Sequence, residues 1–293
     1  MEQYTLENEY LKVTVNKAGA ELSGIVKKET GEEYLWNADA RYWKRHAPVL
    51  FPIVGSLRNK EYEYQGKKYS MSQHGFARDR EFELIDSEED MLLFCLKADE
   101  QTKQVYPFDF ELEVQYVLRG KNIQVQWNVK NKGNKKMYFS IGAHPAFMCP
   151  IGETGEQTEY SLKFDTKDDN LIYHLLNKDG LYTSTEYEME LNHGVCPVTK
   201  HMFDRDALII EKDQAHEVSL MKPDKSIYLS VKFDAPLFGL WSPAGKNAPF
   251  ICIEPWFGRC DSETFCGTIE EREWGNSLNP DDTYSREYSI CIY

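Results

Sequence analysis

Apolar and polar residues alternate along many short stretches of this chain. The clearest stretch is 122–130, where one face would carry Ile123, Val125, Trp127 and Val129 and the other face glutamine and asparagine. A repeat of two residues is typical of a half-buried β-strand. Similar patterns predict further strands at 10–15, 110–118, 137–143, 226–233 and 249–255.

Turn signals separate these stretches and leave little room for helices. The segments "NKG", "KDG" and "SPAGKNAP" are rich in residues that interrupt regular structure. The helical candidates are short: 98–106, which Pro107 would end, and a segment near 270–276. Many short strands with few short helices predict an all-β fold, a large antiparallel β-sandwich. Nothing in the composition marks a boundary, so we expect one domain over 1–293.

Charge and composition limit the classes of molecule that the protein is expected to bind. The 293-residue chain has a formal net charge of −14, which disfavours binding to nucleic acid. No stretch reaches the about 18 apolar residues of a membrane helix, and the first residues do not resemble a signal peptide. Seven cysteines without a CxxC motif indicate reduced, buried thiols. We therefore expect a cytoplasmic protein that binds neither nucleic acid nor a membrane.

Four ionisable residues follow apolar stretches and are the candidates for chemistry. His144 in "FSIGAHP" and Glu254 in "FICIEP" each end a predicted strand and precede a proline, which restricts the backbone. Arg58 ends the apolar stretch "PVLFPIVGSLR", and His74 precedes a glycine that permits a sharp turn. Each residue alone is more often structural. Together they could bind a polyhydroxyl ligand and transfer protons.

The alternation within two strands predicts the surroundings of the histidine and the glutamate. Ser140 and Gly142 would share a face with His144, and their small size would leave open space beside the imidazole. Glu254 would share a face with Phe250 and Cys252. Its carboxylate should then be partly desolvated, which raises the pKa and makes it a better base.

Five motifs, spread in order over most of the chain, carry a family resemblance. They are "PVLFPIVGSLRN" (48–59), "MSQHGFARDREF" (71–82), "YPFDFELEVQYVL" (106–118), "FSIGAHPAF" (139–147) and "ICIEPWFG" (251–258). Together they resemble the aldose 1-epimerase (galactose mutarotase-like) superfamily, most closely its LacX-type branch. The resemblance implies a large β-sandwich whose concave face holds a sugar.

The resemblance also implies a reaction and the residues that perform it. The expected reaction interconverts the α and β anomers of a hexose by opening and closing the sugar ring. His144 would act as the general acid and Glu254 as the general base, while His74 and Arg58 would bind the substrate. This chemistry requires no metal and no organic cofactor.

The residues that select the sugar are less well defined by sequence. The family has an aspartate that binds sugar hydroxyls, and Asp204 and Asp206 are the candidates here. Trp256 could stack on a face of the sugar or simply pack in the core. A phosphorylated hexose would need further basic groups, for which the candidates are Lys44, Arg78 and Arg80. The sequence leaves glucose, galactose and phosphorylated hexoses open, and it does not give the oligomeric state.

Three other functions compete with this one. A metal enzyme could use His74, His144 and Glu254 as ligands, although the HxH and HExxH spacings are absent. A glycosidase would need a second carboxylate beside Glu254, and Asp261 and Glu263 lie near it in sequence. A non-catalytic sugar-binding or sensing protein would keep the cleft without turnover. Metal content and turnover distinguish these functions.

Overall fold

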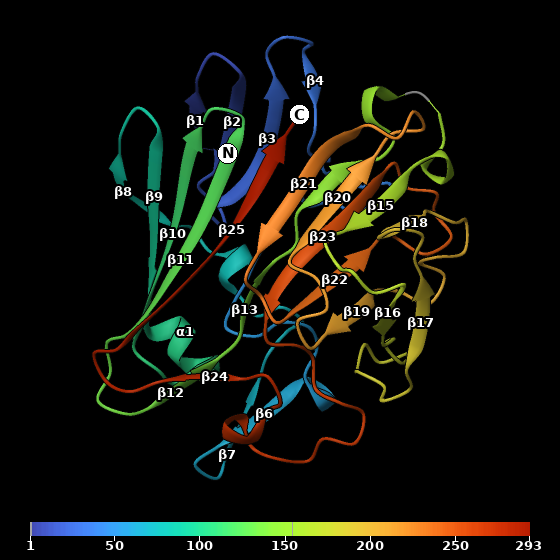
Figure 1. Ribbon diagram of the computed structural model, residues 1–293. Coiled ribbons are helices and arrows are strands. Elements are labelled where there is room, and N and C mark those ends of the chain that lie inside the picture. Colours follow the sequence, from blue (N-terminus) through green and yellow to red (C-terminus); the bar gives the residue numbers. More distant parts are fainter. Residues whose placement is uncertain (1, 154) are drawn as a thin grey trace.

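The computed structural model describes residues 2–153 and 155–293, which fold mainly into antiparallel strands (Figure 1). In this described part, the largest sheet has nine strands. Their order is β18 (Val195–Pro197), β15 (Ser161–Phe164), β20 (Glu217–Met221), β21 (Ile227–Phe233), β25 (Thr283–Ile292), β11 (Asn122–Asn131), β10 (Phe110–Arg119), β9 (Met91–Lys97) and β8 (Glu83–Ser87). The predicted alternation in β11 is confirmed, because its four apolar residues named above are fully buried.

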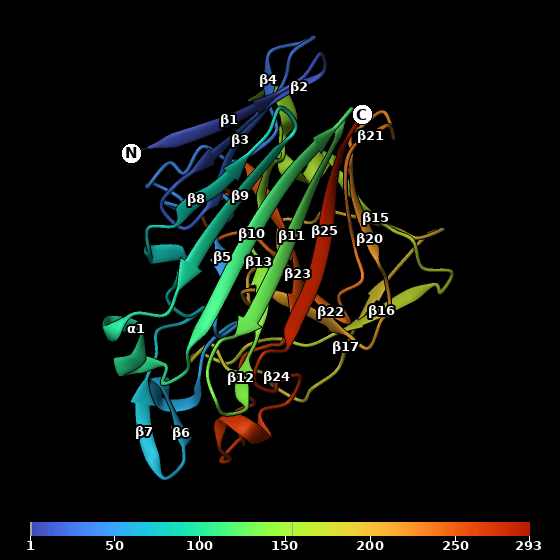
Figure 2. The ribbon, with the colours of Figure 1, turned by 90° about the vertical axis from the view of Figure 1, so that its left-hand side faces the viewer.

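A second sheet, of six strands among the described residues, packs against the first. Its order is β19 (Leu208–Glu211), β22 (Leu237–Trp241), β23 (Phe250–Phe257), β13 (Ile141–Ala143) and β5 (Val49–Leu50), with β14 (Ala146–Met148) also paired to β23. Figure 2 shows the long strands β9, β10, β11 and β25 side by side. Ring contacts join the two sheets, such as Trp127 with Phe257 at 6.4 Å between centroids. The predicted β-sandwich is therefore confirmed.

The remaining elements lie around these two sheets. A smaller sheet contains β1 (Gln3–Glu7), β2 (Leu11–Asn16), β3 (Glu21–Lys27) and β4 (Glu32–Glu33). Paired strands are β6 (Glu61–Tyr64) with β7 (Lys67–Ser70), β12 (Met137–Phe139) with β24 (Asn276–Leu278), and β16 (Asn170–Tyr173) with β17 (Tyr187–Glu190). The 3₁₀ turns are η1 (Arg58–Lys60), η2 (Ala77–Asp79), η3 (Ile151–Glu153), η4 (Gln157–Glu159) and η5 (Ile269–Glu271).

The first predicted helix is confirmed as α1 (Glu100–Val105). Asp99 begins it with a capping box: its carboxylate accepts a hydrogen bond from the Thr102 amide, and its own amide donates to the Thr102 hydroxyl. The second candidate, near 270–276, is not an α-helix: the turn η5 overlaps its start, and β24 begins at Asn276. Within the described residues, none of the helices has the length and apolar character needed to cross a membrane.

The predicted strand at 137–143 is divided between two sheets, and the division positions His144. Ser140 separates β12 from β13, and its amide donates to the carbonyl of Pro52. Its hydroxyl accepts a hydrogen bond from the Val54 amide at 2.8 Å. These contacts take the place of strand pairing at Ser140. The chain then enters the second sheet as β13, and His144 follows directly after β13, beside β23.

Candidate functional site

A cavity of about 230 Å³ is lined by residues of β19, β22 and β23 of the second sheet and by residues of the loops around them. Six polar or aromatic residues that line it carry the argument below: His74, Arg78, His144, Asp206, Glu254 and Trp256. Five of the seven residues that the sequence predicts for the site are in this set, all except Arg58 and Asp204. The cavity combines apolar walls with a few polar groups, as small-molecule sites generally do.

The register of the second sheet places His144 opposite Glu254. β13 and β14 both pair with β23, matching Gly142 with Trp256 on one side and Ala146 with Cys252 on the other. Both pairings share one register, so His144 falls opposite Glu254 between them. The imidazole Nε2 lies 3.3 Å from Oε2 of the carboxylate. The pair is thus built by strand alignment, because directly opposed residues of antiparallel strands have adjacent side chains.

Burial determines the electrostatics of this pair. Glu254 is 1 % exposed and His144 is 8 % exposed. Burial raises the pKa of Glu254 well above its usual range, and the negative charge of Asp206 raises it further. Burial lowers the pKa of His144 to about 3, and the positive charge of Arg78 contributes to the same effect. The raised pKa expected for Glu254 from its apolar strand is therefore present in the structure.

The pair keeps hydrogen-bonding capacity for a ligand. Across the described residues, neither carboxylate oxygen of Glu254 has a hydrogen-bond partner of good geometry, and Nδ1 of His144 also lacks one. Buried polar atoms are normally satisfied, so unsatisfied ones beside a cavity need an explanation. A polar ligand in the cavity would supply the missing partners.

His74 is held in a strained turn that fixes its ring. Its φ is +66°, and the following Gly75 has φ +70°. A Cβ on Gly75 would lie 2.3 Å from the carbonyl oxygen of Phe51, so this position requires glycine. Nδ1 of His74 accepts a hydrogen bond from the Gly55 amide at 3.1 Å, which leaves the proton on Nε2. The ring lies edge-on to His144, with 5.6 Å between centroids.

The structure brings one of the two candidate aspartates to the cavity. Asp206 lines it, and its φ of +74° turns the chain there just before β19. Asp204 is exposed and pairs with His201 at 2.7 Å between Nδ1 and the carboxylate. Asp206 is therefore the carboxylate that can contact a ligand beside Glu254.

The structure does not bring Arg58 to this cavity. Its amide donates to the Asp261 carboxylate at 2.9 Å, and its guanidinium donates to the Phe265 carbonyl at 2.7 Å in a separate surface pocket. The arginine of the cavity is Arg78, whose Nη2 donates to the Gln73 carbonyl at 2.6 Å. Nε of Arg78 is buried without a hydrogen-bond partner in the described part of the chain, although the Asp79 carboxylate lies 3.9 Å away. Burial lowers the pKa of Arg78 to about 10.

Comparisons with known proteins identify the family. The family model for aldose 1-epimerase matches residues 2–291. This chain belongs to the aldose 1-epimerase family. It is 35 % identical over 295 residues to the plasmid-encoded Protein LacX of Lactococcus lactis subsp. lactis, covering 98 % of each chain.

Solved structures show the same fold as this aldose 1-epimerase family member. A galactose mutarotase related enzyme from Lactobacillus acidophilus matches with a TM-score of 0.93 and 33 % identity, covering 100 % of this chain and 97 % of that one. A galactose mutarotase-like protein from Lactobacillus casei ATCC 334 matches with a TM-score of 0.91 and 27 % identity, covering 100 % of both chains. The sequence-based resemblance and the predicted fold are both confirmed.

Two tryptophans that the sequence does not single out surround the imidazole in this family member. Trp43 stacks on His144 with 4.7 Å between ring centroids and an interplanar angle of 29°. Trp241 meets the same ring edge-on at 5.4 Å. Both line the cavity. No local motif marks Trp43, which lies about a hundred residues before the histidine it contacts.

Trp256 occupies the space that the sequence predicts to be open. A Cβ on Gly142 would lie 2.7 Å from the Trp256 ring, and one on Gly239 would lie 2.5 Å from it. The indole is therefore clamped between two glycine backbones. The prediction that Ser140 and Gly142 provide the free space beside the imidazole is wrong, because Trp256 packs against Gly142 and the Val54 amide bonds to Ser140. The cavity beside His144 is lined by other residues, among them His74 and Trp241.

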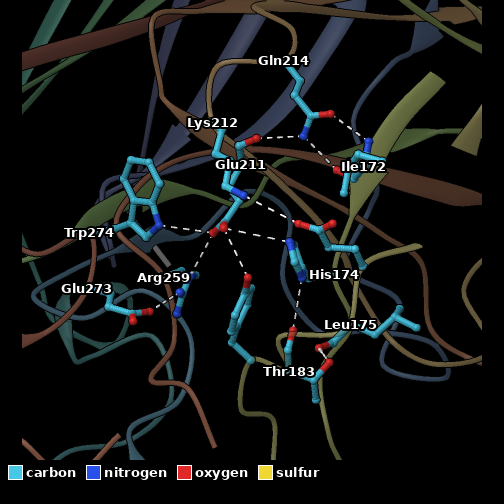
Figure 3. Close-up of polar contacts among 12 residues, drawn as sticks. Ile172, His174, Leu175, Thr183, Glu211, Lys212, Gln214, Arg259, Glu273 and Trp274 are labelled. Atoms are coloured by element: carbon cyan, nitrogen blue, oxygen red, sulfur yellow. Dashed lines mark hydrogen bonds and ion pairs between the residues drawn. The ribbon is translucent and has the colours of Figure 1, made fainter. Parts of the chain in front are cut away.

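A buried polar network supports the cavity wall from behind (Figure 3). Glu211, the last residue of β19, accepts hydrogen bonds from Arg259 Nε at 3.1 Å, the Tyr182 hydroxyl at 3.2 Å and the Trp274 indole at 3.2 Å. Nε2 of His174 lies 3.9 Å from the same carboxylate. The Arg259 guanidinium also sits over the Tyr182 ring at 3.6 Å.

This network connects three segments that line the cavity. β19 supplies Ile209, the segment that begins at His174 supplies Leu176 and Gly180, and Arg259 precedes Cys260. The Ile209 and His174 backbones exchange hydrogen bonds of 2.8 and 2.9 Å. Sequence reasoning assigned no function to His174, because its partners come from distant parts of the chain.

The geometry bears on two of the competing functions. Among the described residues, His144 and Glu254 belong to a cluster of three side chains that could hold a metal ion. The third side chain of this cluster is Cys252 rather than His74. Asp261, a candidate second carboxylate for a glycosidase, pairs with Arg272 at 2.7 Å and accepts the Arg58 amide. These contacts show that the Asp261 carboxylate stabilises the segment around Arg58.

Proposed function

We propose that the protein is an aldose 1-epimerase, or mutarotase, that interconverts the α and β anomers of an aldohexose in this cavity. The observation that carries the proposal is the His144–Glu254 pair, 3.3 Å apart at the cavity with unsatisfied polar atoms. Membership of the aldose 1-epimerase family and similarity to a galactose mutarotase related enzyme support it.

Ring opening needs one group that accepts a proton and one that donates a proton. As a carboxylate, Glu254 takes the proton of the anomeric hydroxyl. As an imidazolium, His144 gives a proton to the ring oxygen. The free aldehyde rotates about its C1–C2 bond, and the ring closes with both roles reversed. The two residues end each turnover with the protons that they had at the start.

The close approach of the two groups suits this exchange. A carboxylate with an imidazolium holds the same single proton as a carboxylic acid with a neutral imidazole. The 3.3 Å contact allows the proton to pass between these two forms. Burial favours the uncharged form, and a bound sugar would supply polar partners for the charged form.

The other cavity residues would hold the sugar and orient its anomeric carbon. Arg78 and Nε2 of His74 donate hydrogen bonds, whereas an ionised Asp206 only accepts them. A sugar hydroxyl can do both, so the two kinds of group complement one another. Trp256 adds an apolar surface of the kind that packs on a sugar face. Fixing the substrate in this way lowers the barrier by positioning.

Polarimetry of freshly dissolved anomers tests the proposal. Purified protein should accelerate mutarotation of α-D-glucose, α-D-galactose or a hexose phosphate, and the same protein should bind that sugar by NMR titration. Binding without acceleration for every sugar that binds would favour the non-catalytic sugar-binding protein instead.

A further inference from the structure

A third ligand group lies beside the His144–Glu254 pair, namely the thiol of Cys252. Cys252 and Glu254 are two residues apart on β23 and therefore share a face of the strand. One nitrogen of His144, the sulfur of Cys252 and one oxygen of Glu254 all lie within 4.8 Å of one another. All three side chains are buried, and two of them line the cavity.

The distances approach those of a tetrahedral zinc site. Zinc bonds of about 2.0–2.3 Å put neighbouring ligand atoms roughly 3.3–3.7 Å apart. The contact between His144 and Glu254, at 3.3 Å, already has this separation. The sulfur of Cys252 lies within 4.8 Å of both atoms, and metal binding would draw it toward the pair. The fourth ligand position would face the cavity, where water or a sugar hydroxyl can bind.

We propose that His144, Cys252 and Glu254 form an inhibitory binding site for Zn²⁺ or another thiolate-seeking divalent metal ion. The inhibition rests on the proposed mutarotase function, because the metal takes the lone pairs that the acid–base pair needs. The thiol proton and the single proton of the pair leave to solvent through the cavity. One thiolate and one carboxylate then balance the two positive charges of the ion, which favours the complex in a buried site.

The ligand types also predict selectivity among metals. A thiolate, an imidazole and a carboxylate suit Zn²⁺ and Co²⁺. Mg²⁺ and Ca²⁺ prefer six or more oxygen ligands, which this group does not supply. The site should therefore respond to Zn²⁺ at concentrations where Mg²⁺ has no effect.

Other cysteines allow a matched test of binding. Cys266 is exposed, so Cys266→Ser removes it as a competing thiol and serves as the parent protein. Cys260 is a second buried cysteine that lines the same cavity outside the proposed ligand group. Cys260→Ser is thus the control for Cys252→Ser, and Cys252→Ala is a second variant in case serine disturbs the strand. Circular dichroism confirms that each variant is folded.

Calorimetric titration with Zn²⁺ and the absorbance spectrum with Co²⁺ test whether the site binds metal, and neither measurement requires enzymatic turnover. The parent should bind Zn²⁺ and show a thiolate-to-cobalt charge-transfer band. Both Cys252 variants should lose that band and bind Zn²⁺ about tenfold more weakly or worse, whereas Cys260→Ser should match the parent. Unchanged Zn²⁺ affinity in folded Cys252 variants, or no thiolate band in the parent, would overturn the proposal.

Anomer exchange then tests the inhibition. Zn²⁺ should slow exchange by the parent, EDTA should restore it, and Cys252→Ser should resist Zn²⁺ while keeping the metal-free rate. Strong Cys252-dependent binding with undiminished exchange would refute the inhibitory role. If no sugar is turned over even with EDTA, the proposed function fails, and the Co²⁺ band still decides whether the metal site exists.

Discussion

His144 and Glu254 face each other because one register governs β13, β14 and β23. The same alignment pairs Gly142 with Trp256 and Ala146 with Cys252, and the two ionisable side chains meet between them with 3.3 Å from nitrogen to oxygen. Glu254 lies on β23, and His144 lies in the two-residue link between β13 and β14, which both pair with β23. A proton acceptor and a proton donor held in this way form a preorganised site.

Removing either member of this pair should abolish exchange without unfolding the protein. Glu254→Gln and His144→Asn should each lower the rate about 10²–10⁴-fold, as expected for loss of general acid–base catalysis. Glu254→Gln should unfold at no lower urea concentration than the wild type, because the amide adds no buried charge. Exchange spectroscopy and urea titration measure the two effects. A near-normal rate in either folded variant would remove that residue from the mechanism.

Asp206 and Asp204 allow a test of ligand binding with a matched control substitution. Asp206→Asn should raise KM by about 10–100-fold, the usual range for a lost hydrogen bond to a charged group. Asp204→Asn should leave KM unchanged, because Asp204 does not line the cavity and pairs with His201. Steady-state kinetics with one sugar compares them. An equal effect of both substitutions would contradict the assignment of Asp206.

Arg78 and Arg58 provide a second matched pair. Arg78→Met should weaken sugar binding, because Arg78 lines the cavity and its Nε is buried. The loss should be about tenfold or more, as for Asp206. Arg58→Met should leave sugar affinity unchanged, since its side chain donates to the Phe265 carbonyl elsewhere. NMR titration with the substrate gives both affinities. Weaker binding in Arg58→Met alone would restore the role that the family resemblance implies for Arg58.

The network behind the cavity wall should contribute strongly to stability. Arg259→Met leaves the Glu211 carboxylate buried without its cation and should cost about 3–5 kcal/mol in the free energy of unfolding. Glu273 also contacts Arg259, but its side chain is 59 % exposed, so Glu273→Gln should cost at most about 1 kcal/mol. Urea denaturation measures both. Similar costs for the two variants would show that the buried pair has no special role.

Much of the fold could be predicted from sequence because strand patterning is local. The alternation at 122–130 requires only neighbouring residues, and the helix at 98–106 is defined by its cap and the following proline. The strand at 137–143 was predicted as continuous. It is divided because Ser140 bonds to the Pro52–Val54 segment, a distant partner that no local pattern reveals.

The candidate site shows the same division between local and distant information. His144 and Glu254 stand out locally, as ionisable residues that follow apolar stretches and precede prolines. The expectation that Glu254 ends its strand is wrong, because β23 continues through Pro255 to Phe257. Arg78 lines the cavity and Arg58 does not. This difference depends on how turns that are distant in sequence pack together. Trp43 likewise reaches His144 only through the folded chain. Alignment between distant strands supplies information that patterning within one strand lacks.

Saturation-transfer NMR of anomer exchange, recorded with EDTA present, tests the central claim most directly. Wild-type protein should transfer saturation between the α and β anomeric protons of a hexose that it binds, and Glu254→Gln should bind the same sugar without exchange. Exchange that EDTA abolishes, or a bound sugar that the wild type leaves unexchanged, would contradict acid–base mutarotation by His144 and Glu254.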